Sequence, residues 1–129
     1  MDHPNLDLLR RAFTAFAEAD FDTLAEVFDE HVVWHYPGNN QLSGDHVGRE
    51  ATFAMFASEF GLTNGTLKPD MSDALASDDH VVALFHTTAQ RDDKTLDQNV
   101  ALFFHISGDK IAEAWTVWKD AAAADAFWA

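Results

Sequence analysis

Histidines are the residues of this chain best suited to acid–base chemistry, because an unperturbed imidazole has a pKa of about 6.5, close to neutral pH. His86 stands out because it lies within a long β-prone segment. Side chains alternate between the two faces of a strand, so Thr88 shares the face of His86 and Trp115 shares that of Glu113. If both faces turn inward, Glu113 orients the His86 imidazole and raises its basicity. We therefore predict His86 and Glu113 as a catalytic pair; the alternative is a structural His86 that hydrogen-bonds to a neighbour.

Two further histidines bracket a turn earlier in the chain. His35 lies in the segment W-H-Y-P-G, and His46 follows the polar loop after it. Strict alternation places Trp34 and Tyr36 on one strand face and His35 on the other, although a short strand beside a turn can depart from this rule. The cluster resembles one wall of a pocket. The predicted ligand-binding residues are Trp34, His35, Tyr36, His46, Thr88 and Trp115.

Composition narrows the function classes. The chain has 22 acidic and 8 basic residues, and its formal net charge of -14 argues against nucleic acid as a partner. It has no cysteine, and its histidines show no H-x-H or H-E-x-x-H spacing, so we expect no metal site. No apolar run approaches the roughly 18 residues of a membrane span, and the first residues do not resemble a signal peptide. We expect a cytoplasmic protein without a membrane partner.

The order of predicted elements indicates the fold class. Apolar residues recur at helical spacing in segments 5–18, 23–28 and 49–60, with Asp22 as the expected N-cap of the second helix. The expected strands are residues 32–36, 67–76, 80–91, 96–106 and 111–119, and a short tail helix begins after Asp120. Helices come first and an antiparallel meander follows, which predicts a single α+β domain over residues 1–129.

Four segments in this order resemble the SnoaL-like branch of the NTF2-like superfamily, which includes polyketide cyclases, ketosteroid isomerase and limonene epoxide hydrolase. They are A-E-A-D-F-D-T-L-A-E-V-F, V-V-W-H-Y-P-G, L-S-G-D-H-V-G-R-E-A and G-D-K-I-A-E-A-W-T-V-W-K-D. The resemblance implies a cone of helices packed on a curved sheet, with an apolar pocket and no cofactor. It also implies a homodimer, with Phe85 and Trp118 on the sheet face that meets the second copy.

The catalytic patterns of these relatives are incomplete in this chain. Limonene epoxide hydrolase uses an Arg-x-Asp and a Trp-x-Asp. The segments of this chain that resemble them are His86-x-Thr88 and Trp115-x-Val117, which lack both Asp residues. Ketosteroid isomerase places its base Asp before a Pro, where this chain has Tyr36. We therefore expect a protein that binds a small apolar molecule, with His-mediated isomerase, cyclase or hydrolase chemistry. The alternative is a non-catalytic ligand-binding or dimerisation module of the same fold.

Overall fold

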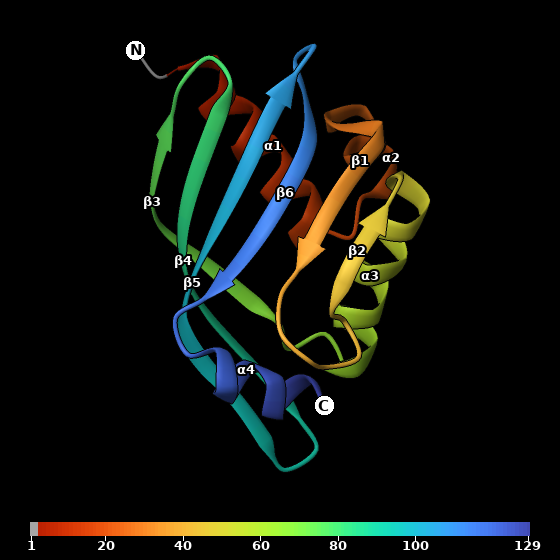
Figure 1. Cartoon of the computed structure of the whole chain (residues 1–129), viewed down its shortest axis with the longest axis vertical. Helices are drawn as coiled ribbons and strands as arrows, with labels where there is room; N and C mark the ends of the chain where they lie inside the picture. The colour runs from red at the N-terminus through yellow and green to blue at the C-terminus, as the bar shows by residue number, and fades with distance from the viewer. Residues whose placement is uncertain (1–2) are drawn as a thin grey trace.

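A six-stranded curved sheet organises the computed structural model, which describes residues 3–129 (Figure 1). The helices are α1 (Pro4–Ala17), α2 (Phe21–Val27), α3 (Arg49–Leu62) and α4 (Ala121–Trp128). The strands are β1 (Phe28–Tyr36), β2 (Gly44–Val47), β3 (Lys68–Ala76), β4 (His80–Arg91), β5 (Lys94–Ser107) and β6 (Lys110–Trp118). The strand order is β2-β1-β6-β5-β4-β3, with β1 and β6 parallel and the other neighbours antiparallel. The expected α+β, NTF2-like cone is confirmed.

One face of the sheet is covered by helices and the other is open. In Figure 1 the strands pass in front of α1, which contacts β3 and β4, while α3 contacts β1 and β2. Alternate residues of β4, Val81, Ala83 and Phe85, are buried on the covered face. We call this covered side the inner face and the opposite side the outer face. The inner face and the helices enclose the apolar core.

Helix and strand ends show where the local pattern was misread. The N-cap of α2 is Asp20, whose carboxylate accepts from the backbone N–H of Thr23, and not the predicted Asp22. Asp20 precedes the first helical residue, which is the position where a side-chain acceptor can reach a free N–H. β1 begins at Phe28, which the helical spacing had assigned to the second helix. Asp120 caps α4 as expected, accepting from Ala123 N–H at 3.0 Å.

The C-terminal helix, α4, is hydrogen-bonded to the turn that follows β1. The Asp125 carboxylate accepts from the backbone N–H of Asn39 at 2.9 Å and from the Asn40 side-chain amide at 2.8 Å. The Arg91 guanidinium donates to the Phe127 carbonyl at 2.6 Å, which joins α4 to the end of β4. The turn is therefore held by Asp125, a residue more than 80 positions later in the chain.

Replacing Gly38 by Ala should test this attachment. Gly38 has a φ of +88°, and an added Cβ would lie 2.2 Å from Asp125 Oδ1, so Asp125 must leave its hydrogen bonds. Gly44 also has a positive φ, +113°, but a Cβ there meets nothing within 4 Å. Both substitutions strain the backbone. We expect Gly38→Ala to lower the free energy of unfolding by about 1–2 kcal/mol more than Gly44→Ala in urea denaturation. Equal losses would contradict the role given to Asp125.

Candidate functional site

A cavity of about 70 Å³ lies between the inner face of the sheet and helices α1, α2 and α3. Most of its lining is apolar, and its aromatic residues are Phe13, Phe16, Phe28, Trp34, Tyr36, Phe56, Phe85, Phe104 and Trp118. The polar side chains of the lining are Thr87, Thr116 and Glu59, together with the Tyr36 hydroxyl and the indole N–H groups of Trp34 and Trp118. A largely apolar pocket with a few polar groups is the usual form of a small-molecule site.

Trp34 and Tyr36 line this cavity, so the alternation in W-H-Y predicts their side correctly. The Trp34 indole N–H donates to the Thr116 hydroxyl at 2.8 Å, which fixes the ring against β6. Both side chains are buried, and both lie where a ligand in the cavity would touch them. Ligand contact by these two residues stays a prediction.

Glu59 is the functional candidate that the sequence analysis missed. It lies on α3 three residues after Phe56, and this spacing turns its side chain toward the same apolar wall. Its carboxyl group has no hydrogen-bond or ion-pair partner among residues 3–129. Glu59 is half-buried, and desolvation of its carboxyl group raises its pKa to about 8. The available signal was a single acidic residue at helical spacing within the apolar run F-A-M-F-A-S-E-F.

Two hydrogen-bond donors in the cavity wall also lack partners. Tyr36 Oη and Trp118 Nε1 are buried, and neither makes a hydrogen bond within the described part of the chain. Burial, and after it the nearby Glu59 carboxylate, raise the pKa of Tyr36, while the Trp118 indole N–H opposes the shift because it approaches the Tyr36 hydroxyl as a hydrogen-bond donor would, without reaching hydrogen-bonding geometry. Tyr36 therefore stays a neutral hydroxyl. The two donors and the Glu59 carboxyl belong to one cavity wall formed by β1, β6 and α3.

The expected pairing of His86 with Glu113 is not found. His86 is exposed on the outer face, where its Nε2 lies 2.5 Å from Asp97 Oδ1 and its Nδ1 lies 2.8 Å from Asn99 Oδ1. These hydrogen bonds raise the pKa of His86. Thr88 lies on the same outer face, away from the cavity. The alternation along β4 was read correctly, but the inward face was the wrong one.

Glu113 pairs with His35 on the outer face. Its Oε2 lies 2.5 Å from His35 Nε2, and Asp45 Oδ1 lies 2.7 Å from His35 Nδ1. The His35 ring stacks on Trp115 with centroids 5.3 Å apart. Desolvation disfavours the charged imidazole, but hydrogen bonds to Glu113 and Asp45 outweigh it, and the pKa of His35 is raised.

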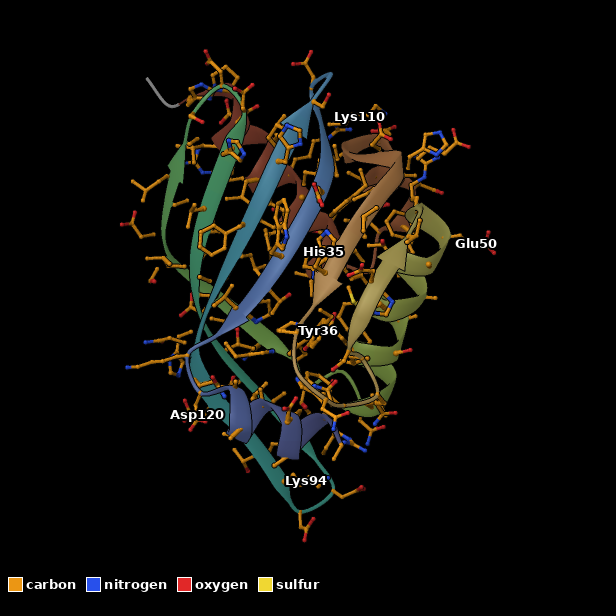
Figure 2. The ribbon with its side chains drawn as sticks, in the orientation of Figure 1. His35, Tyr36, Glu50, Lys94, Lys110 and Asp120 are labelled. Atoms are coloured by element: carbon orange, nitrogen blue, oxygen red, sulfur yellow. The ribbon has the colours of Figure 1, made fainter. Side chains whose placement is uncertain are left out.

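His35 and Tyr36 are therefore neighbours in β1 that serve opposite sides of the sheet (Figure 2). His46, the other predicted ligand residue of this region, contacts neither the cavity nor the His35 cluster. Its Nε2–H donates to the Leu42 carbonyl at 2.7 Å and holds the loop before β2. His35, His46, Thr88 and Trp115 thus do not line the cavity. Phe85 and Trp118, expected on the opposite side, do line it.

Two further observations concern ions and membranes. No group of three or more His, Asp or Glu side chains within residues 3–129 is arranged to hold a metal ion. Within the same range, no helix combines the length and the apolar character needed to span a bilayer.

Comparison with known proteins identifies the family. Residues 9–114 match the SnoaL-like domain. This chain belongs to the SnoaL-like family. The SnoaL-like chain is 33% identical to the uncharacterised protein Rv0034 of Mycobacterium tuberculosis over 129 residues, covering 99% of this chain and 98% of the relative.

Solved structures agree with this assignment. Bal32a, from a soil-derived mobile gene cassette, is 38% identical with a TM-score of 0.94, covering 98% of this chain and 97% of its own. IdmH, a putative polyketide cyclase from Streptomyces antibioticus, has a TM-score of 0.74 at 16% identity, covering 92% and 93%. The second likeness shows the fold alone.

Ionisation of Glu59 should leave a signature in stability. The pKa of Glu59 is raised from 4.5 to about 8, so between these values the folded protein holds a proton that the unfolded chain has lost. Glu59 therefore lowers the free energy of unfolding by about 1.4 kcal/mol per pH unit as pH rises through this window. We expect urea titrations from pH 5 to 9 to show a shallower pH dependence for Glu59→Gln than for wild type.

Glu50→Gln is the matched control, because Glu50 is exposed at the start of the same helix (Figure 2). It should follow the wild-type pH dependence. Identical curves for wild type and Glu59→Gln would show that the Glu59 carboxyl is not held protonated.

The outer-face imidazoles of His35 and His86 should titrate independently. The hydrogen bond from Glu113 helps to raise the pKa of His35, so Glu113→Gln should lower that pKa. His86 is held by Asn99 and Asp97, so its pKa should not move. NMR titration of the two imidazole rings in wild type and Glu113→Gln measures both. A change in the pKa of His86 in Glu113→Gln would instead indicate that His86 interacts with Glu113.

Proposed function

We propose that this SnoaL-like protein binds a small, largely apolar molecule in its cavity and moves a proton on it, with Glu59 as the acid–base group. The observation that carries the proposal is a carboxyl group without a protein partner, on the wall of an apolar cavity, with its pKa raised to about 8. Burial and raised pKa values are how enzymes adapt carboxylic acids to work near neutral pH.

The position of the histidines supports Glu59 over an imidazole. His35 and His86 lie on the outer face, so neither can reach a ligand on the inner face without crossing the sheet. Of the described residues that line the cavity, Glu59 is the only one that exchanges a proton readily near neutral pH. The proposal therefore keeps the acid–base chemistry expected from the sequence and moves it to a different residue.

A single acid–base group favours one kind of reaction. The Glu59 carboxylate removes a proton from a carbon next to a carbonyl group, and the resulting carboxylic acid returns it to another atom of the same ligand. This sequence needs no second acid or base, unlike a hydrolysis that activates water and protonates a leaving group in separate steps. An isomerase-like or cyclase-like reaction is thus preferred to hydrolysis.

The fold comparison supports a pocket function of this kind. IdmH is described as a putative polyketide cyclase, and TerC, with a TM-score of 0.83 at 15% identity, was crystallised with polyporic acid. These likenesses concern the fold. The assignment of chemistry to Glu59 rests on this chain's own cavity.

Exchange of carbon-bound hydrogen for deuterium tests the proposal before the natural substrate is known. Wild-type protein and a panel of small cyclic ketones and enones are incubated in D₂O at pD 7 to 9, and deuterium uptake beside the carbonyl is followed by NMR. We expect wild type to accelerate exchange over buffer, and Glu59→Gln to lose about 100-fold or more of that acceleration, because an amide cannot accept the proton.

The control for this experiment is again Glu50→Gln, which removes a carboxylate from the exposed first turn of α3 and should exchange at the wild-type rate. Unchanged exchange in Glu59→Gln, or no acceleration by wild type on any ketone of the panel, would favour the non-catalytic ligand-binding alternative.

A further inference from the structure

We propose that Tyr36 Oη and Trp118 Nε1 jointly bind one oxygen atom of the ligand, and that the cavity selects neutral carbonyl compounds over hydrocarbons, ammonium ions and carboxylates of the same shape. This proposal rests on the ligand-binding part of the function proposed above and not on its proton-transfer step. It assigns a polar docking point to two residues that no comparison marks.

The two donors are conspicuous because buried polar groups in folded proteins nearly always have partners. Three buried side-chain polar atoms within residues 3–129 have none, and two of them, on Tyr36 and Trp118, belong to residues that line the cavity. The third, on Trp128, belongs to α4, which does not contribute to the lining. By contrast the cavity's other indole N–H, on Trp34, is already bonded to Thr116.

Strand pairing explains why the two donors lie on the same side. β1 and β6 are parallel neighbours, and their register pairs Trp34 with Ala114 and His35 with Trp115. Tyr36 and Trp118 close the same ends of these strands and face inward in both. The Trp118 N–H lies close enough to Tyr36 Oη to lower the pKa of that hydroxyl in the manner of a hydrogen-bond donor, but the two groups do not meet in hydrogen-bonding geometry. One acceptor atom held between them can take both hydrogen bonds.

An indole N–H only donates, so its partner must be an acceptor. A carbonyl oxygen has two lone pairs and can accept from Tyr36 and Trp118 together. An ammonium ion would pair with the Glu59 carboxylate, but it has no lone pair for the Trp118 N–H. A hydrocarbon would leave both donors unsatisfied.

The charge of the lining excludes anions. No lysine, arginine or histidine lines the cavity, so nothing there offsets the desolvation of a carboxylate. When Glu59 ionises, its negative charge repels an anionic ligand. Below its pKa of about 8 the Glu59 carboxyl is neutral, and a neutral ligand is then the best electrostatic match.

Binding of four probes with the same five-membered ring tests the selectivity. They are cyclopentanone, methylenecyclopentane, cyclopentylammonium and cyclopentanecarboxylate, measured at pH 6.5 by quenching of tryptophan fluorescence. We expect wild type to bind cyclopentanone about tenfold or more tighter than methylenecyclopentane, because two neutral hydrogen bonds distinguish them. The ammonium and carboxylate probes should bind more weakly than the ketone.

Tyr36→Phe and Trp118→Phe should each reduce the preference for the ketone to about threefold or less, with little change for methylenecyclopentane. Trp115→Phe is the matched control, because Trp115 lies on the same strand and faces the outer side, and it should keep the wild-type preference. The thermal midpoint of ligand-free Tyr36→Phe should equal or exceed that of wild type, since the hydroxyl it removes has no partner. This separates a lost docking point from a damaged fold.

Three results would overturn the proposal: equal affinity of wild type for the ketone and the hydrocarbon, tightest binding of the ammonium ion, or an undiminished ketone preference in Tyr36→Phe. Failure to bind any probe up to its solubility limit would count equally against it. Glu59→Gln distinguishes this outcome from failure of the proposed function. At pH 6.5 the variant should keep the ketone preference, because glutamine is neutral like the protonated acid, while it loses deuterium exchange.

Discussion

Parallel pairing between β1 and β6 is the constraint on which both faces of the molecule depend. It places side by side two strands whose interacting residues, such as Trp34 and Thr116, lie 82 positions apart. On the inner face it brings Tyr36 to the side of Trp118, and on the outer face it brings His35 to Glu113. A parallel pair needs a crossover connection, and here β2, α3, β3, β4 and β5 all lie between the two strands in the chain. The candidate site can therefore form only when the whole sheet has formed.

The cavity wall carries groups that make the fold less stable than it could be. An unpartnered buried hydroxyl, an unpartnered indole N–H and a carboxyl with a displaced pKa each cost free energy that a phenylalanine or leucine at the same position would not. Most of these costs fall at one place, on residues 36, 59 and 118, and the exception is the unpartnered Trp128 indole N–H in α4. Local violations of good packing are expected at functional sites, where stability is traded for chemistry. The clustering is the reason to treat this wall as a site.

Much of the fold could be predicted from spacing, but of the site only Trp34 and Tyr36 could. Phe53, Phe56 and Phe60 mark α3 as a helix, and the turns at residues 92–94 and 107–110 separate the long strands. The failure lies in choosing which strand face turns inward. In β4 one face carries Val81, Ala83 and Phe85 and the other carries Val82, Leu84 and His86, so both are similarly apolar and alternation alone does not decide between them. That choice depends on which residues α1 covers, a long-range contact.

The same difficulty explains the neglect of Glu59. A lone glutamate on a helix is usually solvated, and only the position of the sheet reveals that this one borders a cavity. Because Glu59 borders the cavity, its ionisation changes two properties in opposite directions: its availability as a base and the stability of the fold. As pH rises toward 8, more of the Glu59 population becomes the carboxylate that can act as a base, while the free energy of unfolding falls because the charge is desolvated. A ligand whose carbonyl oxygen satisfies Tyr36 and Trp118 binds only the folded state and offsets that loss. The Glu59 carboxylate therefore forms with the smallest loss of folding stability when a ligand occupies the cavity.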